Sequence, residues 1–182
     1  MKHKWKLLKK RLVYPQKWVE VERWRMRLPA GRERDFYINR GNDFVIVCAI
    51  TKAGQMVALK QYYVNIRRKI LSLVAGYIDK GETPSRAARR ELREETGYEA
   101  GRLVALGTSI KGKYMTGTVH YYLALGARRV GKQHLEESED IAVATIGIKK
   151  FQNLVATHQF RDAFVEVGAR RAMDYFANHN YL

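Results

Sequence analysis

The chain has 182 residues, and hydrophobic residues make up 46% of them, which is enough for one compact domain with a small additional unit. Its longest apolar run, Phe44 to Ile50, has the length of a strand and excludes a membrane-spanning helix. The formal net charge is +16, and residues 1–40 alone contain 13 Lys and Arg against 4 Asp and Glu. Such an excess attracts polyanions, RNA and nucleotides alike, without choosing between them.

The single cysteine and the first residues of the chain indicate the cellular compartment in which the protein is expected. The single cysteine, Cys48, lies inside the apolar run, so we expect a buried, inert thiol and no disulfide within the chain. Residues 1–13 are basic, and the apolar stretch of a signal peptide does not follow them. These features predict a cytoplasmic protein without a membrane segment.

The first elements predicted along the chain are strands. Residues 19–28 alternate between apolar and polar, which indicates a strand with one solvated face, and a turn at residues 29–31 leads to a second strand over 35–39. With the segment Tyr14–Trp18 they form a predicted antiparallel β unit over residues 1–40. Because so small a unit is not stable alone, we expect it to pack on the main domain or to join two subunits of a homodimer.

The main domain is predicted to span residues 41–182. Its strands are expected near residues 43–50, 55–61, 102–110, 118–125 and 140–147. Apolar residues at 3.6-residue spacing predict two terminal helices, one around Phe151 and one from Val165 to Phe176. This order predicts an α/β fold with a mixed sheet between helices.

A loop and a helix are predicted between the second and third of these strands. Thr83 suits the N-cap, and Pro84 suits the first helical position, where its missing N–H costs nothing. The residues from Ser85 to Glu95 include no Gly, and Gly97 suits a left-handed C-terminal cap. The predicted helix therefore spans residues 84–96.

Three carboxylates share one face of this helix. Glu91, Glu94 and Glu95 project from neighbouring turns and repel one another by roughly a few tenths of a kcal/mol per pair. Arg90 can pair with Glu94 and with Glu82 in the loop, and a divalent cation would relieve the remaining repulsion. Oxygen ligands without His or Cys favour Mg²⁺, with Mn²⁺ as second candidate, over zinc. The alternative is an ordinary solvated helix face rich in ion pairs.

The same region matches a longer pattern, G-x5-E-x7-R-E-U-x-E-E-x-G-U with U aliphatic or aromatic. All its specified positions are filled, by Gly76, Glu82, Arg90, Glu91, Leu92, Glu94, Glu95, Gly97 and Tyr98. A chance match in a chain of this length is roughly one in ten million. The chain thus resembles the Nudix hydrolases, which hydrolyse a diphosphate joining a nucleoside to another group. The resemblance implies their α/β/α sandwich with a mixed sheet.

The resemblance also implies roles for the motif residues. Glu91 and Glu95 would be the principal metal ligands, with Glu94 as a further ligand or supporting catalytic carboxylate and the backbone carbonyl of Ala75 as another ligand. A bound metal would neutralise phosphate oxygens and activate a water. The residues that would hold the loop against the helix are Gly76, Glu82, Arg90 and Gly97.

Further segments resemble the ADP-ribose and nucleoside-diphosphate-sugar pyrophosphatases of that family. They are the N-terminal sheet, Gln61-Tyr62-Tyr63, Ser72-Leu73-Val74-Ala75-Gly76, the acidic run from Glu136 to Ile141, and a closing helix. Tyr63 replaces a usual Arg, Ser72 a usual Glu and Val74 a usual Pro, and Lys113 occupies the place of a Pro common in ADP-ribose hydrolases. A broader hydrolase, acting on substrates such as GDP-mannose, is therefore at least as well supported as one for ADP-ribose.

The acidic run and several other residues are candidates for chemistry and binding. The resemblance places a late glutamate in this run that deprotonates water or binds a metal, with Glu139 as first choice and Glu136 as second; a plain polar loop is the alternative. Arg67 and Arg68, with Lys69, are candidates to clasp the diphosphate, or they form an ordinary basic loop. Candidates for a nucleobase platform, each otherwise a packing residue, are Trp18, Trp24, Phe36 and Tyr62.

Three functions follow from these features. The first is Mg²⁺-dependent hydrolysis of a nucleoside diphosphate sugar or ADP-ribose to a nucleoside monophosphate and a sugar phosphate. The second is pyrophosphate removal from RNA 5′ ends, which the net charge of +16 favours but the lack of a recognisable RNA-binding module does not. The third is a non-catalytic nucleotide- or RNA-binding module on the same scaffold.

Overall fold

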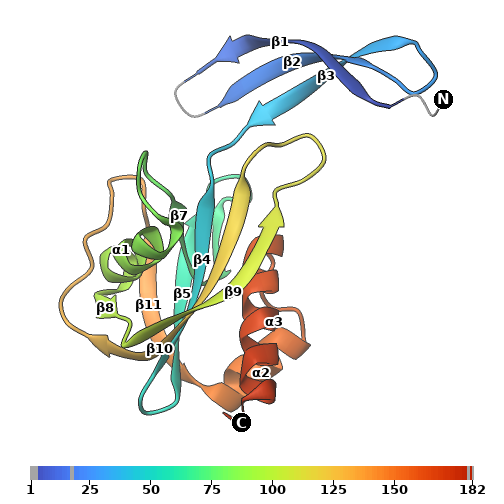
Figure 1. The fold of residues 1–182 in the computed structure, drawn as a ribbon. Helices are drawn as coiled ribbons and strands as arrows, with labels where there is room; N and C mark the ends of the chain where they lie inside the picture. Colours follow the sequence, from blue (N-terminus) through green and yellow to red (C-terminus); the bar gives the residue numbers. More distant parts are fainter. Residues whose placement is uncertain (1–3, 17–18, 180, 182) are drawn as a thin grey trace. The chain divides into compact units, whose positions relative to one another are not determined.

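The computed structural model describes residues 4–16, 19–179 and 181, and its chain divides into two compact units (Figure 1). The first contains the described residues up to Asp43 together with Ser109–Thr118, and the second contains Phe44–Thr108 and the residues from Val119 onward. The return of Ser109–Thr118 to the first unit had no signal in the sequence. Within the described residues, no helix is both long enough and apolar enough to cross a membrane.

The first unit is a three-stranded antiparallel sheet in the order β1-β2-β3. Its strands are β1 (Lys6–Pro15), β2 (Glu20–Arg27) and β3 (Glu33–Arg40). The predicted antiparallel unit is therefore present, but the prediction of its first element at Tyr14–Trp18 was wrong, because that strand lies upstream in a basic run without polar–apolar alternation. The described part of Tyr14–Trp18 contributes only the end of β1, and Lys17 and Trp18 lie outside the described residues.

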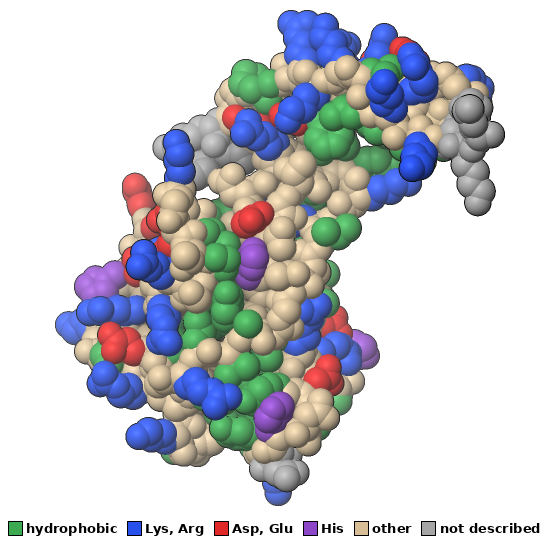
Figure 2. Space-filling model, in the orientation of Figure 1, with side chains coloured by type: hydrophobic (Ala, Val, Ile, Leu, Met, Phe, Trp, Pro, Cys, Tyr) green, Lys and Arg blue, Asp and Glu red, His purple; other side chains and the backbone are tan. Residues whose placement is uncertain are grey.

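One face of this sheet carries a ladder of like charges, which we call the cationic ladder. Pairing of β1 with β2 sets Lys6 opposite Arg27, Lys9 opposite Arg25 and Arg11 opposite Arg23. Like charges in directly opposite positions destabilise a sheet. Asp35 and Glu33 of β3 offset part of the charge through ion pairs with the β2 arginines. Figure 2 shows Lys and Arg side chains gathered over this sheet.

The second unit is built on an eight-stranded mixed sheet. Its path runs β11-β5-β4-β10-β8, with β6 on β5, β7 on β4 and β9 on β10, and β4 and β10 are parallel. The strands are β4 (Phe44–Thr51), β5 (Gln55–Tyr63), β6 (Arg68–Ser72), β7 (Val74–Tyr77), β8 (Tyr98–Glu99), β9 (Arg102–Ile110), β10 (Thr118–Arg129) and β11 (Ile141–Gly147).

Helices cover both faces of this sheet. Helix α1 (Pro84–Thr96) lies on one face, and α2 (Ile148–Ala156) and α3 (Ala163–Asn178) lie on the other (Figure 1). Strand β4 is apolar throughout because both of its faces are covered. Its alternate residues Val45, Val47 and Ala49 pack with α1, and Ile46, Cys48 and Ile50 pack with α2 and α3. The predicted α/β/α sandwich with a mixed sheet is confirmed.

The α3 face is closely packed at two positions. Gly168 of α3 lies so near β4 that a Cβ added there would be 2.6 Å from Cγ2 of Ile46. Cys48 is fully buried beside it, and burial raises the pKa of its thiol far above the usual range. The expected buried, inert cysteine is therefore present.

Candidate active site

Helix α1 begins and ends as its local sequence predicts. Thr83 Oγ1 accepts a hydrogen bond from the backbone N–H of Arg86, and Pro84 is the first helical residue. Gly97 has φ 73° in the left-handed region and closes the helix through a hydrogen bond from its N–H to the carbonyl of Arg93. The buried side of α1 comprises Ala87, Ala88, Leu92 and Thr96, together with the carboxylates Glu91 and Glu95.

Glu91 occupies a space that only glycine leaves open. Strand β7 brings Gly76 under the helix, where an added Cβ would lie 1.9 Å from the carboxyl carbon of Glu91. Real Cβ atoms essentially never show such a distance. The glycine of the motif therefore forms a cradle for the carboxylate of Glu91.

Glu95 is buried with one oxygen unsatisfied. Its side chain is 1% exposed; Oε2 accepts a hydrogen bond of 3.1 Å from the N–H of Ala75, whereas Oε1 has no hydrogen-bond partner among the described residues. A buried carboxylate oxygen without a partner is unfavourable unless a proton or a cation reaches it. The structure thus leaves Oε1 available to a ligand.

Both buried carboxylates hold protons more tightly than ordinary glutamates. Burial raises the pKa of Glu95 to about 9, against the opposing hydrogen bond from Ala75, and the charges of Glu91, Glu139 and Glu94 raise it further. Burial raises the pKa of Glu91 to about 7, although Arg90 opposes the shift. A cation between these groups would replace the protons and lower both pKa values.

Arg90 organises the rest of the motif. Its guanidinium binds both carboxylate oxygens of Glu82, at 3.1 and 2.8 Å, and donates to the carbonyl of Tyr77 at 2.9 Å. It also binds Glu91 at 2.7 Å and Glu94 at 3.1 Å. The expected pairings of Arg90 with Glu82 and Glu94 are therefore present, and the first of them lowers the pKa of Glu82.

The motif residues have the chemistry of a metal site, although Arg90 engages the side chains of Glu91 and Glu94. Within the part of the chain that the structure describes, no three Asp, Glu, His or Cys side chains already form a metal-holding group. The candidate ligands, which are the carboxylates of Glu91, Glu94 and Glu95 and the carbonyl of Ala75, nevertheless all offer oxygen atoms, and Glu95 Oε1 is buried without a partner, which suits a hard divalent cation. The residues present therefore fit such an ion.

The acidic loop of residues 130–140 is fastened to the end of α1. The side-chain amide of Gln133 donates to the carbonyl of Glu95 at 2.7 Å, and the N–H of His134 donates to the carbonyl of Glu94 at 2.8 Å. Gly97 also permits this contact, since a Cβ there would lie 2.4 Å from the carbonyl oxygen of Gly131. Gln133 has no signal in the sequence, because no local pattern shows that an amide 38 residues after Glu95 will contact it.

This fastening brings Glu139 close to the buried carboxylates. Its charge contributes to the raised pKa of both Glu91 and Glu95. Glu139 is half-buried and accepts a hydrogen bond from the N–H of Glu136, whose own side chain is exposed. Of the two late glutamates considered, Glu139 is therefore the one whose charge reaches Glu91 and Glu95.

Tyr63 and Ser72 form a neutral pair beside the carboxylates. Their hydroxyls are 3.5 Å apart, in the two places where the related pyrophosphatases usually carry Arg and Glu. The two departures noted in the sequence are therefore neighbours in space. Burial raises the pKa of Tyr63, the Ser72 hydroxyl opposes the shift, and the charges of Asp162 and Glu95 raise it further.

The other predicted substrate-binding residues are scattered. Arg67 is exposed in the β5–β6 turn with φ 51°, and Arg68 begins β6. A pocket of about 220 Å³ contains Arg68 together with Tyr63, Asn65, Ile66, Ile70, Arg161 and Asp162. Tyr62 is 41% exposed on β5 and its N–H donates to the carbonyl of Asp140, while Trp18 lies outside the described residues.

Two further aromatic candidates lie in the first unit. Trp24 donates its indole N–H to Glu22 at 2.7 Å. Phe36 stacks on Tyr114 and meets Trp5 edge to face, with ring centroids 6.4 and 5.9 Å apart. Both rings therefore have packing roles within the three-stranded sheet.

Comparisons with known proteins place this site in a family. A family profile described as the NUDIX domain matches residues 40–167. The chain is 29% identical over 160 residues to the ADP-ribose pyrophosphatase of Bacillus subtilis (strain 168), covering 87% of this chain and 86% of that protein. It is 30% identical over 141 residues to the GDP-mannose pyrophosphatase of Escherichia coli (strain K12), covering 71% and 72%. It is also 31% identical over 138 residues to the methanol dehydrogenase activator of Bacillus methanolicus, covering 74% of each.

A solved structure shares the whole fold. A chain described as an ADP compounds hydrolase matches with a TM-score of 0.86 over 98% of this chain and 97% of that chain, at 20% identity. The present chain belongs to the Nudix family, and the predicted likeness to its ADP-ribose and sugar pyrophosphatase subgroup is confirmed. It is an enzyme, a hydrolase acting on phosphoanhydrides, in a family whose members generally use a divalent metal.

Proposed function

We propose that this enzyme hydrolyses the diphosphate of nucleoside diphosphate sugars, GDP-mannose or ADP-ribose among them, with Mg²⁺ as its metal and Mn²⁺ as a substitute. The observation that carries the proposal is the buried carboxylate of Glu95, with one oxygen held by Ala75 and the other without a partner, beside Glu91 in its glycine cradle. The names of the Bacillus and Escherichia relatives support the substrate class.

The proposed residues divide the chemistry between them. Glu91 and Glu95, with Glu94 and the carbonyl of Ala75, would hold the metal, which supplies charge neutralisation to the diphosphate and acidity to a water. Glu139 accepts a proton from the attacking water as its oxygen bonds to one phosphorus. The bond from that phosphorus to the bridging oxygen breaks, and the bridging oxygen leaves on the other phosphate. The products are a nucleoside monophosphate and a sugar phosphate.

We propose that basic side chains bind the phosphates of the substrate and that the neutral pair of Tyr63 and Ser72 lies near its uncharged part. Arg68 and Arg161 line the small pocket that Tyr63 shares, and the charge of Glu95 reaches Tyr63. We propose that Arg68, with Arg67 in the preceding turn, binds the substrate phosphates. Tyr63 would accept a neutral hydroxyl-bearing group such as a sugar, and Ser72, which is fully buried, would orient the Tyr63 hydroxyl.

A substrate panel tests the function. GDP-mannose, ADP-ribose and 5′-triphosphorylated RNA are incubated with the enzyme in Mg²⁺, in Mn²⁺ and in EDTA, and the released phosphates are separated by ion-exchange chromatography. The proposal expects one of the two nucleotide sugars to be hydrolysed fastest and EDTA to abolish turnover. Turnover of the RNA alone, or turnover that persists in EDTA, would contradict it.

The cationic ladder favours a second candidate, hydrolysis at RNA 5′ ends. Six cations face one another across β1 and β2, and Tyr37 lies opposite Arg23 with 60% of its surface exposed. Cations beside exposed aromatic rings suit single-stranded nucleic acid. Changing Lys6 and Lys9 to Gln should lower turnover of triphosphorylated RNA and leave GDP-mannose turnover unchanged. Equal effects on both substrates would remove this candidate.

We also propose that the first unit joins two subunits. Opposite its cationic ladder the sheet exposes apolar side chains, including Leu7 at 44% and Leu12 at 39%, and a sheet of three strands is small for independent stability. Light scattering after size-exclusion chromatography should report a dimer for the native chain and a monomer for L7K/L12K. A native monomer would contradict the proposal.

A further inference from the structure

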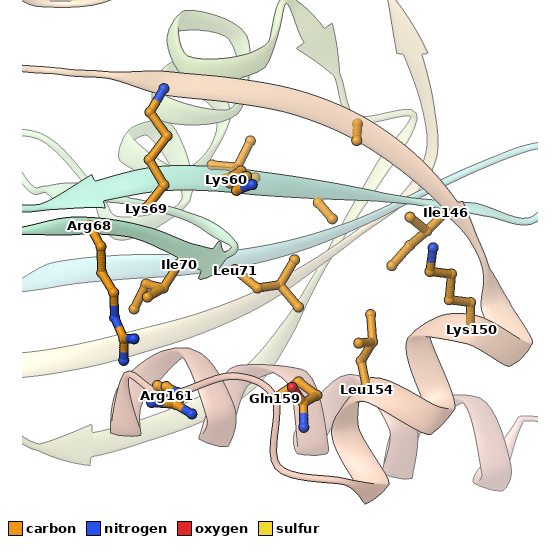
Figure 3. Close-up of a pocket in the computed structure, with 13 residues that line it drawn as sticks. Lys60, Arg68, Lys69, Ile70, Leu71, Ile146, Lys150, Leu154, Gln159 and Arg161 are labelled. Carbon is orange, nitrogen blue, oxygen red and sulfur yellow. The ribbon is translucent and has the colours of Figure 1, made fainter.

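A cavity of about 510 Å³ opens on the face of the central sheet that α2 and α3 cover. Its floor is aliphatic and comes from both the sheet and the helix, with Ala58, Ile70, Leu71, Ala144, Ile146 and Leu154 as members. In Figure 3, Leu71 and Leu154 lie between the two ends of the cavity, Arg68 and Arg161 lie at one end, and Ile146 and Lys150 lie together at the other. Its volume is in the range of pockets that hold small organic ligands.

The cavity lies on the opposite side of the sheet from the carboxylates. Along β5, Met56 packs in the core with α2 and α3, and Ala58 and Lys60 follow it at alternate positions. Val57 belongs to the core beneath α1, and so does Leu59, which also borders the cavity at one edge. On β11, Ile146 is paired with Met56, and it packs with α2 and α3. The cavity is therefore distinct from the site of Glu91 and Glu95.

Cations from four separate segments surround it. They are Lys60 of β5, Arg68 of β6, Lys150 of α2 and Arg161 of the α2–α3 loop. A fifth, Lys69, points away in Figure 3 and pairs with Asp140. The four others have no ion pair with a carboxylate within residues 4–16, 19–179 and 181, and the lining includes no Asp or Glu. Four like charges around one cavity repel one another, and an anion would relieve that repulsion.

We propose that this cavity binds an organic phosphate, a phosphate group attached to an apolar or aromatic body of nucleotide size. Arg161 at one end, with Lys60 and Lys150 around the aliphatic floor, would hold the phosphate, because guanidinium and ammonium groups both bind phosphate oxygens. The aliphatic floor would accept the body of the ligand. Arg68, which is assigned above to the substrate phosphates, borders both this cavity and the small pocket of Tyr63, so the ligand is tested through the other cations of the cavity.

Binding is measured by isothermal titration calorimetry in EDTA, so that no metal assists the carboxylates. The probe is adenosine 5′-monophosphate, and adenosine and inorganic phosphate represent its two halves. The proposal expects the whole nucleotide to bind at least about tenfold more tightly than either half, since each half uses only one part of the cavity. Equal affinity for inorganic phosphate, or no binding of the nucleotide, would overturn it.

Paired double variants place the ligand. K60Q/K150Q removes two cations of the cavity, and K52Q/K149Q removes two exposed lysines elsewhere on the same unit. The first should weaken nucleotide binding by about tenfold or more, and the second should leave it unchanged. Thermal unfolding of both variants shows whether they fold. Equal weakening in both double variants would mean that the nucleotide is attracted only by the net charge of the protein. Loss of binding in Glu95→Gln would mean that the nucleotide binds at the catalytic site. Either result would overturn the proposal.

Discussion

Buried acidic groups on one face of the central sheet contrast with exposed basic groups on the other, in a chain whose net charge is +16. On the α1 face, Glu91 and Glu95 are buried together and their pKa values are raised by burial. On the α2–α3 face, Lys60, Arg68, Lys150 and Arg161 surround a cavity without an acidic residue. The net charge of the chain therefore does not determine the chemistry of a site within it. The local surroundings determine it, as where burial of Glu91 against the backbone of Gly76 raises the pKa of this carboxyl group.

The largest expected effect is on the α1 face. Glu95→Gln keeps the shape of the side chain but removes the charge that the unsatisfied oxygen offers to a metal. Turnover of the best nucleotide sugar should fall by at least about 10²-fold, since changes even in the outer shell of a metal site lower activity 10- to 100-fold. Steady-state kinetics measures this. The matched control, Glu137→Gln in the exposed acidic loop, should be unaffected, and equal activity of both variants would remove Glu95 from the site.

Glu139→Gln tests the proposed base. If Glu139 accepts the proton of water, its loss should lower kcat by about 10²–10⁴-fold and flatten the acid limb of the pH–rate profile. Glu136→Gln serves as the comparison, because Glu136 is the second candidate in the same turn. A profile that keeps its acid limb in the Glu139 variant would assign the base elsewhere.

Two glycine-to-alanine substitutions, one on each face of the central sheet, should affect different properties, one the activity and the other the stability. Gly76→Ala would place a Cβ against the carboxylate of Glu91, so we expect loss of activity. Gly168→Ala would place a Cβ 2.6 Å from Cγ2 of Ile46. Overpacking would destabilise the fold and the higher helix propensity of Ala would offset part of this, so we expect a net loss of about 1–2 kcal/mol. Urea unfolding and turnover per folded molecule measure both quantities. An active Gly76→Ala enzyme would contradict the cradle.

The pH dependence of stability should distinguish the metal-free from the metal-bound protein. The folded pKa values of Glu91 and Glu95, about 7 and about 9, lie above their ordinary value, so the folded state binds more protons than the unfolded state between about pH 5 and 9. The free energy of unfolding in EDTA should therefore fall as the pH rises through this window. Groups with lowered pKa values, such as Glu82, act below it. Added Mg²⁺ should stabilise the protein more at pH 8 than at pH 6, because binding displaces those protons.

The sequence predicts an element well when residues within that element fix where it begins and ends, and poorly when contacts with distant residues do so. Thr83, Pro84 and Gly97 define α1 by themselves, and the predicted span 84–96 is the observed one. Strand β1 was misplaced because its pairing with β2, not an internal pattern, defines it. The candidate site was predictable where the motif spacing fixes it, as for the contacts of Arg90 with Glu82 and Glu94.

Long-range contacts account for what the sequence did not predict. Gln133 reaches Glu95 from a loop that follows three intervening strands, and the neutral pair of Tyr63 and Ser72 emerges only when β5 and β6 are side by side. The cavity on the second face needs four segments to come together. No spacing rule links such residues before the chain is folded.

Mn²⁺ titration followed by electron paramagnetic resonance shows whether Glu91 and Glu95 hold the metal. We expect the native enzyme to bind Mn²⁺, E91Q/E95Q not to bind it, and K60Q/K150Q on the opposite face to bind it as the native enzyme does. Undiminished Mn²⁺ binding by E91Q/E95Q would show instead that groups other than the two buried carboxylates hold the metal.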